Sequence, residues 1–90
     1  MKTSEKIKFI LDNFDFSPVS NYLKLTNMRI DGQYPSEENL RSIGEFCLNG
    51  LLKSEHSSFN YYGFEATREE DELELSFVLS RMSTLGQTLN

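Results

Sequence analysis

The clearest pattern in the chain is a strict alternation of side-chain character near its C-terminal end. Apolar residues occupy every second position there: Leu73, Leu75, Phe77 and Leu79. The positions between them are mainly polar: Glu74, Ser76, Val78 and Ser80. A period of two predicts a β-strand with one face on the core, so residues 73–79 are expected to form one.

Residues 61–66 predict a second strand, which pairs with the first as a β-hairpin. The connection, residues 68–72, reads Arg-Glu-Glu-Asp-Glu and contains no Asn-Gly type of tight turn, so we expect a longer loop. On an uninterrupted strand Phe59 and Tyr61 lie on the face opposite to Phe64. They are then either an exposed aromatic pair, typical of a binding surface, or residues tucked under the N-terminal helices.

Helical spacing characterises the N-terminal third. Four apolar residues share one helical face, at spacings of three and four: Ile7, Ile10, Leu11 and Phe14. We expect Thr3 or Ser4 to cap this helix, which ends near Asn13. Ser17 followed by Pro18 predicts the cap and first residue of a short second helix, with Val19, Tyr22 and Leu23 facing inward.

The main helix is predicted to begin after Ser36 and to stop near Lys53. Its apolar face contains a residue at every third or fourth position: Leu40, Ile43, Cys47, Gly50 and Leu51. A glycine on a buried helix face often permits the close approach of another element, and we expect this of Gly44. Between the two helical regions, Met28 to Ile30 predicts a short strand that ends at an Asp31-Gly32 turn.

These elements predict an α+β fold. N-terminal helices, a short strand, a main amphipathic helix and a C-terminal hairpin form a small antiparallel sheet, covered on one face by helices. Residues 1–81 are expected to be one compact domain, and residues 82–90 a flexible tail.

Charge is unevenly distributed along the 90 residues, whose net charge is −5. Residues 36–74 contain three basic and ten acidic residues. An acidic half disfavours direct nucleic-acid binding, which needs a basic face, and it would suit a protein partner with a basic surface. The alternative is that the acids only keep a small domain soluble.

Few residues carry the chemistry that catalysis requires. Cys47 and His56 are the sole cysteine and histidine. They cannot supply a zinc site, and neither has an obvious catalytic partner. We expect Cys47 to be a buried helix residue. No catalytic residue, cofactor or metal ligand is predicted, and the protein is not expected to be an enzyme.

The chain shows no signal-peptide pattern and no apolar run long enough to span a membrane. A lone cysteine is also typical of a reducing compartment. The expected location is therefore the cytoplasm.

One region is left for function, the outer margin of the predicted hairpin. The partner-binding candidates are its aromatic pair and its acidic residues: Phe59, Tyr61, Glu69, Glu70, Asp71, Glu72 and Glu74.

One set of short motifs is spread over residues 15–79: Asp15-Phe16, Val19, Tyr22-Leu23, Thr26-Asn27, residues 35–40, Tyr62-Gly63-Phe64-Glu65 and residues 73–78. In these motifs the chain resembles a group of small uncharacterised proteins encoded by phages and prophages. Those proteins have an Asn-Trp-x-Trp-like strand where this chain has Met28 and Ile30, and Gly-Gly-Phe where it has Tyr-Gly-Phe. The resemblance implies an accessory protein of a mobile element, a kind that commonly binds a host protein.

The leading hypothesis is therefore a non-enzymatic, phage-related interaction protein that binds and modulates or inhibits a host protein, such as a defence component. Two alternatives stay open. An unprotected sheet edge would allow a homodimer or another homo-oligomeric accessory protein. The acidic surface would alternatively mimic a nucleic acid.

Overall fold

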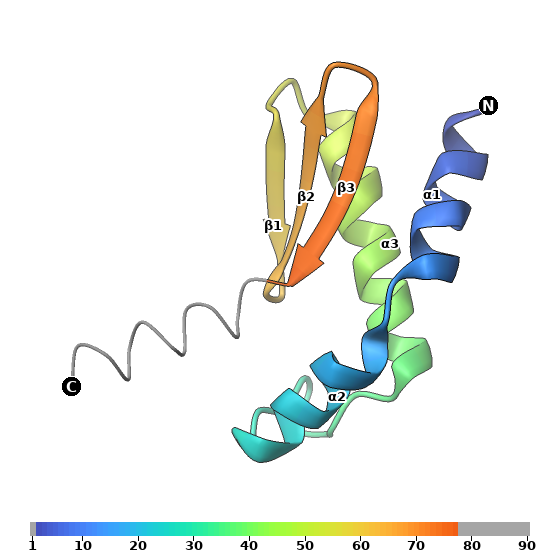
Figure 1. Ribbon diagram of the computed structural model, residues 1–90. Coiled ribbons are helices and arrows are strands. Elements are labelled where there is room, and N and C mark those ends of the chain that lie inside the picture. The colour runs from blue at the N-terminus through green and yellow to red at the C-terminus, as the bar shows by residue number, and fades with distance from the viewer. Residues whose placement is uncertain (1, 78–90) are drawn as a thin grey trace.

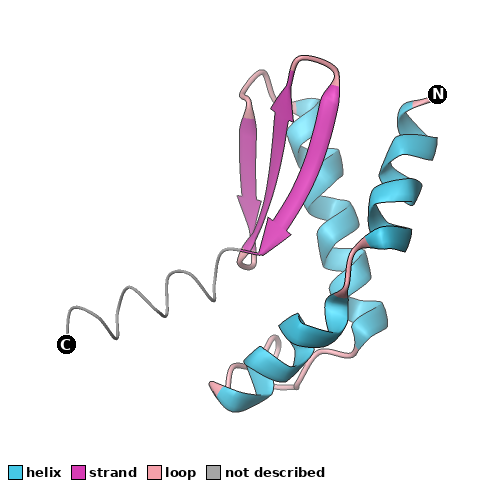
Figure 2. Cartoon of the chain, in the orientation of Figure 1, coloured by secondary structure: helices cyan, strands magenta, loops and turns pink. Residues whose placement is uncertain are grey.

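The computed structural model describes residues 2–77. Three helices precede three strands: α1 (Thr3–Asn13), α2 (Phe16–Leu25), α3 (Glu37–Lys53), β1 (Ser58–Tyr61), β2 (Phe64–Glu69) and β3 (Glu72–Phe77). The strands form one antiparallel sheet in the order β1-β2-β3, and the helices lie on one side of it (Figure 1; Figure 2). The predicted α+β fold, with a sheet covered on one face, is confirmed.

The helices follow the predicted periodicity, although two of the predicted caps are wrong. Lys2, rather than Thr3 or Ser4, precedes α1, and the helix ends at Asn13 as expected. Asp15, rather than Ser17, caps α2, because its carboxylate accepts a hydrogen bond of 3.0 Å from the backbone N–H of Ser17. Pro18 then lies in the first helical turn, where a missing N–H costs no intrahelical bond.

The main helix, α3, begins and ends where its sequence predicts. Ser36 caps it by accepting the backbone N–H of Asn39 at 3.1 Å, and Lys53 is its last residue. The predicted close approach at Gly44 is confirmed, since a Cβ there would lie 3.1 Å from Leu75 of β3. Helix and sheet therefore pack in direct contact at this position.

The predicted strand at Met28 to Ile30 does not form. Ile30 makes only an isolated bridge with Gln33, in which each backbone N–H donates to the other residue's carbonyl. Between them Asp31 and Gly32 have φ of 54° and 79°, which is a tight turn. The bridge satisfies the backbone locally, so this segment stays outside the sheet.

The third strand comes instead from residues 58–61, because the predicted strand 61–66 is interrupted. Tyr62 and Gly63 have φ of 48° and 84°, as a two-residue type I′ hairpin turn requires. The chain reverses there, which pairs Tyr61 with Phe64 and Phe59 with Ala66. All four side chains consequently point to the same face of the sheet.

The acidic connection is also a tight turn, so the prediction of a longer loop was wrong. Only Glu70 and Asp71 separate the paired residues Glu69 and Glu72. Glu70 adopts a φ of 58°, in the left-handed region that non-glycine residues rarely occupy. The pairing of β2 with β3 continues up to this turn.

The core lies between the helices and the inner face of the sheet. Its buried apolar residues come from all three helices and from β2 and β3: Ile7, Leu11, Phe16, Val19, Leu23, Leu40, Cys47, Leu48, Leu51, Phe64, Ala66 and Leu75. The ring of Phe64 lies 5.2 Å from that of Phe77 and 6.1 Å from that of Phe16, in edge-on arrangements. This aromatic cluster joins the sheet to the N-terminal helices.

Two predictions fall partly outside the described residues. The predicted strand 73–79 corresponds to β3, of which residues 78 and 79 are not described. The predicted tail at 82–90 lies wholly outside. Within residues 2–77, no helix combines the length and apolarity that a membrane span requires.

Candidate functional site

The structure divides the predicted partner-binding residues between the two faces of the sheet. Phe59 and Tyr61 lie on the inner face and are half-buried. The ring of Phe59 covers Gly50 of α3, and the ring of Tyr61 lies 4.5 Å from that of Phe46. Both aromatics therefore pack against α3, neither as an exposed pair nor under the N-terminal helices.

The acidic candidates belong to the outer face and to the β2–β3 turn. The outer-face positions, read from the strand pairing, are Ser58, Asn60, Glu65, Thr67, Glu69, Glu72, Glu74 and Ser76. None of the three described helices covers this face (Figure 1). Every charged residue on it is a glutamate. With the turn residues Glu70 and Asp71, they form what we call the acidic face: Glu65, Glu69, Glu70, Asp71, Glu72 and Glu74.

The pairing of β2 with β3 brings two like charges of the acidic face together. Glu69 lies directly opposite Glu72, on the same side of the sheet. Like charges in that position destabilise a sheet, and no ion pair within residues 2–77 includes any of the six acids. The nearest basic contact is weak, because Lys6 reaches the backbone carbonyl of Asp71, at 3.4 Å, rather than its carboxylate.

Arg68, beside the acidic turn in sequence, does not neutralise it. Its position on β2 places it on the inner face, opposite Leu73. The guanidinium donates to the backbone carbonyls of His56, at 3.0 Å, and Ser54, at 3.5 Å. Its hydrogen bonds thus fasten the connection between α3 and β1 to the sheet.

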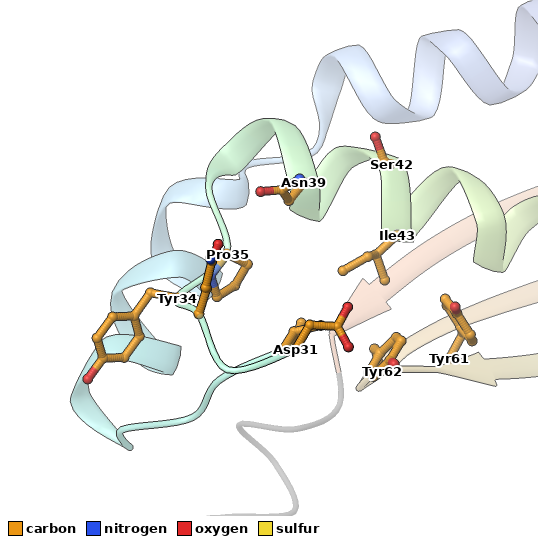
Figure 3. Close-up of a pocket in the computed structure, with 10 residues that line it drawn as sticks. Asp31, Tyr34, Pro35, Asn39, Ser42, Ile43, Tyr61 and Tyr62 are labelled. Carbon is orange, nitrogen blue, oxygen red and sulfur yellow. The ribbon is translucent and has the colours of Figure 1, made fainter.

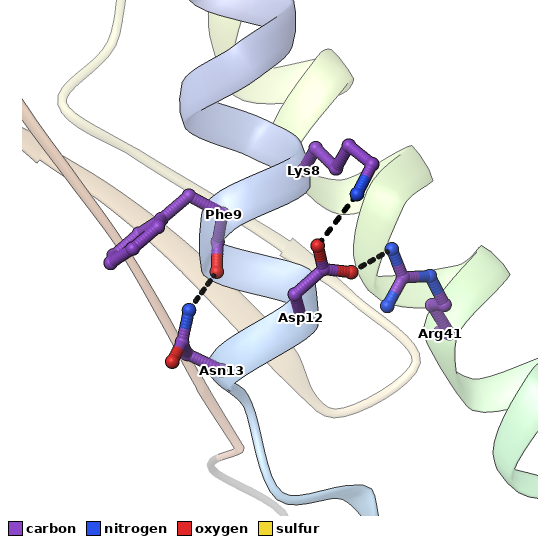
Figure 4. Close-up of polar contacts among 5 residues, drawn as sticks. All are labelled: Lys8, Phe9, Asp12, Asn13 and Arg41. Atoms are coloured by element: carbon purple, nitrogen blue, oxygen red, sulfur yellow. Dashed lines mark hydrogen bonds and ion pairs between the residues drawn. The ribbon is translucent and has the colours of Figure 1, made fainter.

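In the helical layer, by contrast, an acid forms ion pairs. Asp12 of α1 accepts hydrogen bonds from Lys8 of the same helix, at 2.8 Å, and from Arg41 of α3, at 2.6 Å (Figure 4). Lys8 and then Arg41 hold the pKa of this exposed carboxyl below its ordinary value of 3.8. Asp12 thus links two helices, whereas the six acids of the acidic face form no ion pair within residues 2–77.

A pocket of about 340 Å³ opens at the other end of the sheet, between α3 and the Tyr62 turn (Figure 3). Its lining includes Ile43 of α3, the rings of Tyr61 and Tyr62, and Asp31, whose carboxylate points toward Tyr62. Among the described residues that line it, Asp31 is the only one with a carboxylate, and none is a histidine or cysteine. These residues offer no acid–base pair or activated nucleophile. The Asp31-Gly32 turn was predicted but the pocket was not, because its lining joins that turn and α3 to Tyr61 and Tyr62, which are distant in sequence.

Cys47 and His56 offer no alternative chemistry. Cys47 is fully buried, as predicted, and its thiol donates to the carbonyl of Phe59 at 3.2 Å. Burial raises the pKa of the thiol, which keeps it protonated and poorly nucleophilic. His56 is exposed in the loop after α3. In the described part of the chain, no three His, Cys, Asp or Glu side chains are grouped to hold a metal ion.

Comparison of the chain with known protein families, curated proteins and solved structures found no match. The resemblance to phage-encoded proteins stays a prediction. The acidic face and the Tyr62 pocket are therefore interpreted from their own geometry. Of the two, the acidic face has the stronger physical signature, since its like charges lie close together without an ion pair among residues 2–77.

Proposed function

We propose that this protein is a non-enzymatic binding protein whose acidic face docks on a basic surface of a protein partner. One observation supports this most. Glu69 and Glu72 face each other across the strands, uncovered by any helix and without an ion pair among the described residues. A basic partner would relieve the repulsion and gain complementary charge.

The form of the acidic face favours a compact protein surface as the partner. The six acids gather at the β2–β3 turn and along two adjacent strands. Their combined field would speed encounter with a basic surface and would be strongly screened by salt. The polar neighbours Thr67 and Ser76 add hydrogen-bonding groups on the same face.

The proposed setting follows from the resemblance of residues 15–79 to phage and prophage proteins. In that setting the partner is a protein of the host cytoplasm, such as a defence component. Binding inhibits or redirects this partner by occupying its basic surface. The proposal assigns no catalytic residue and no cofactor to the chain.

Capture from a bacterial lysate tests this function with two matched baits. The first carries Glu69→Gln, Glu72→Gln and Glu74→Gln. The second carries Glu38→Gln, Glu45→Gln and Glu55→Gln, which remove three exposed acids from α3 and the following loop. Both change the net charge equally. We expect the first bait to lose a protein that the wild type and the second bait retain, as measured by mass spectrometry.

We expect the first bait to stay folded, because removing like charges from one face stabilises the sheet. Circular dichroism of both baits checks this. Equal capture by all three baits, or equal loss from both variants, contradicts the proposal. Displacement of the captured protein by duplex DNA would instead identify the acidic face as a nucleic-acid mimic.

A further inference from the structure

The two edges of the sheet are not equivalent. α1 packs beside β3, where Lys6 donates to the backbone carbonyl of Asp71 at 3.4 Å. No described element lies beside the outer edge of β1 (Figure 1). β1 is therefore an open edge strand within the described part of the chain.

The backbone groups that β1 presents at this edge follow from its pairing with β2. Tyr61 and Phe64 close a two-residue turn and are a hydrogen-bonded pair, and the N–H of Arg68 donates to the carbonyl of Ser57 at 2.8 Å. Hydrogen-bonded pairs alternate along an antiparallel ladder. Ser58 and Asn60 consequently direct their N–H and C=O groups away from β2.

β1 is short, at four residues, but its edge lacks the other features that usually prevent strand pairing. β1 has no charged residue and no proline, and its register with β2 is continuous, without a bulge. Within the sheet, the acids lie on β2, β3 and their turn rather than on β1. β1 is thus an edge where two copies of an acidic protein can approach with little repulsion.

α3 is uncovered on the same side of the molecule. It packs over β1 and β2, and its Phe46 side chain stays 56% exposed despite its contact with Tyr61. Phe46, Asn49, Gly50 and Lys53 of α3, together with Phe59, line a hollow beside this edge. An exposed phenylalanine thus lies next to unpaired strand backbone.

We propose that β1 of a second copy pairs antiparallel with β1, with Ser58 opposite Asn60 of the second copy, to form a six-stranded sheet. In this register Phe59 meets Phe59 of the second copy on the twofold axis. The outward N–H and C=O groups of Ser58 and Asn60 are then satisfied in both copies.

The position of α3 over the sheet favours a second copy of the chain, rather than a lone peptide, as the strand that pairs with β1. Strands in a sheet are about 4.8 Å apart. α3 lies over β1 and β2, so it is roughly one strand spacing from the twofold axis. The two α3 helices would therefore be about 10 Å apart, within the normal packing distance of helices. The same twofold rotation pairs the two β1 edges and covers both Phe46 side chains. This dimer does not depend on the function proposed for the acidic face.

Molar mass measured by light scattering over increasing concentration tests the dimer. We expect the wild type to approach twice the 10.4 kDa of one chain. Asn60→Pro removes an N–H that β2 does not use, so it leaves the hairpin ladder intact. It should weaken association at least about tenfold, because each dimer loses two hydrogen bonds. A wild type that stays at 10.4 kDa at all concentrations overturns the proposal.

A matched pair of phenylalanine variants tests the helix contact. Phe46→Glu introduces two like charges between the α3 helices and should abolish the dimer. Phe9→Glu makes the same change at another exposed helical phenylalanine, 61% accessible on α1, and should leave the dimer intact. Dissociation by Phe9→Glu, or a dimer that survives both Phe46→Glu and Asn60→Pro, would contradict this interface.

The register of β1 against β1 of the second copy is tested by cross-linking, which does not require the dimer to be weakened. Oxidation of a mixture of Ser58→Cys and Asn60→Cys chains should join position 58 to position 60, since paired Cα atoms are about 5.5 Å apart. Links between two copies of position 58 require spanning about 9 Å and should be at least about tenfold rarer. Predominant links between identical positions would overturn the proposed register.

Discussion

The two faces of the sheet are built from alternate residues of the same strands, yet they differ in almost every physical respect. On the inner face, Phe64 and Ala66 are completely buried against the helices. On the outer face, Glu65 and Thr67 alternate with them and no helix covers them. Packing on one face provides stability, which leaves the other face free to accumulate unpaired charge. Stability and the proposed binding can therefore be perturbed separately in this domain.

The largest expected effect comes from opening a cavity on the inner face. Phe64→Ala should lower the free energy of unfolding by about 3–5 kcal/mol, since the ring is fully buried among Phe14, Phe16 and Phe77. Thr67→Ala, on the outer face of the same strand, should change it by less than about 0.5 kcal/mol. Equilibrium urea denaturation measures both, and similar losses would contradict the division between the faces.

A medium effect is expected where Phe59 meets α3. Gly50→Ala would place a methyl group 2.6 Å from the ring of Phe59. Although alanine ordinarily favours a helix by about 1 kcal/mol over glycine, this change should destabilise the protein by about 1–3 kcal/mol.

The neighbouring change Asn49→Ala, at an exposed helical position, should be neutral or slightly stabilising in the same denaturation experiment. Phe59→Leu should relieve part of the loss when combined with Gly50→Ala. A stabilising Gly50→Ala would show that the Phe59 ring is free to move away, as an outward-facing residue would be.

The smallest effect, of opposite sign, is expected on the acidic face. Glu72→Gln removes the like charge opposite Glu69 and should raise stability by about 0.2–1 kcal/mol. The gain should shrink in 1 M salt, because the Debye length falls to about 3 Å. Glu74→Gln, which lies opposite the uncharged Thr67, should give a smaller gain. A loss of stability from Glu72→Gln would show that Glu72 has a stabilising partner.

Part of the candidate site could be predicted from composition and alternation alone. Glu69, Glu72 and Glu74 were identified because acids concentrate in that stretch of sequence. Phe59 and Tyr61 were placed on the wrong face, since a two-residue turn at Tyr62 reverses the face that each following residue occupies. Tyrosine rarely adopts a positive φ, so Tyr62-Gly63 is a weaker turn signal than Asn-Gly.

The sequence by itself determined the three helices, the alternating strand β3 and the uneven distribution of charge. These depend on interactions between residues a few positions apart, such as the Ser36 cap and the spacing of Leu40, Cys47 and Leu51. Only the tertiary structure decided that β1 exists, which face holds Phe59, and which edge of the sheet stays open. Those features depend on strand register and on packing against α3, which join residues far apart in the chain and have no local sequence pattern.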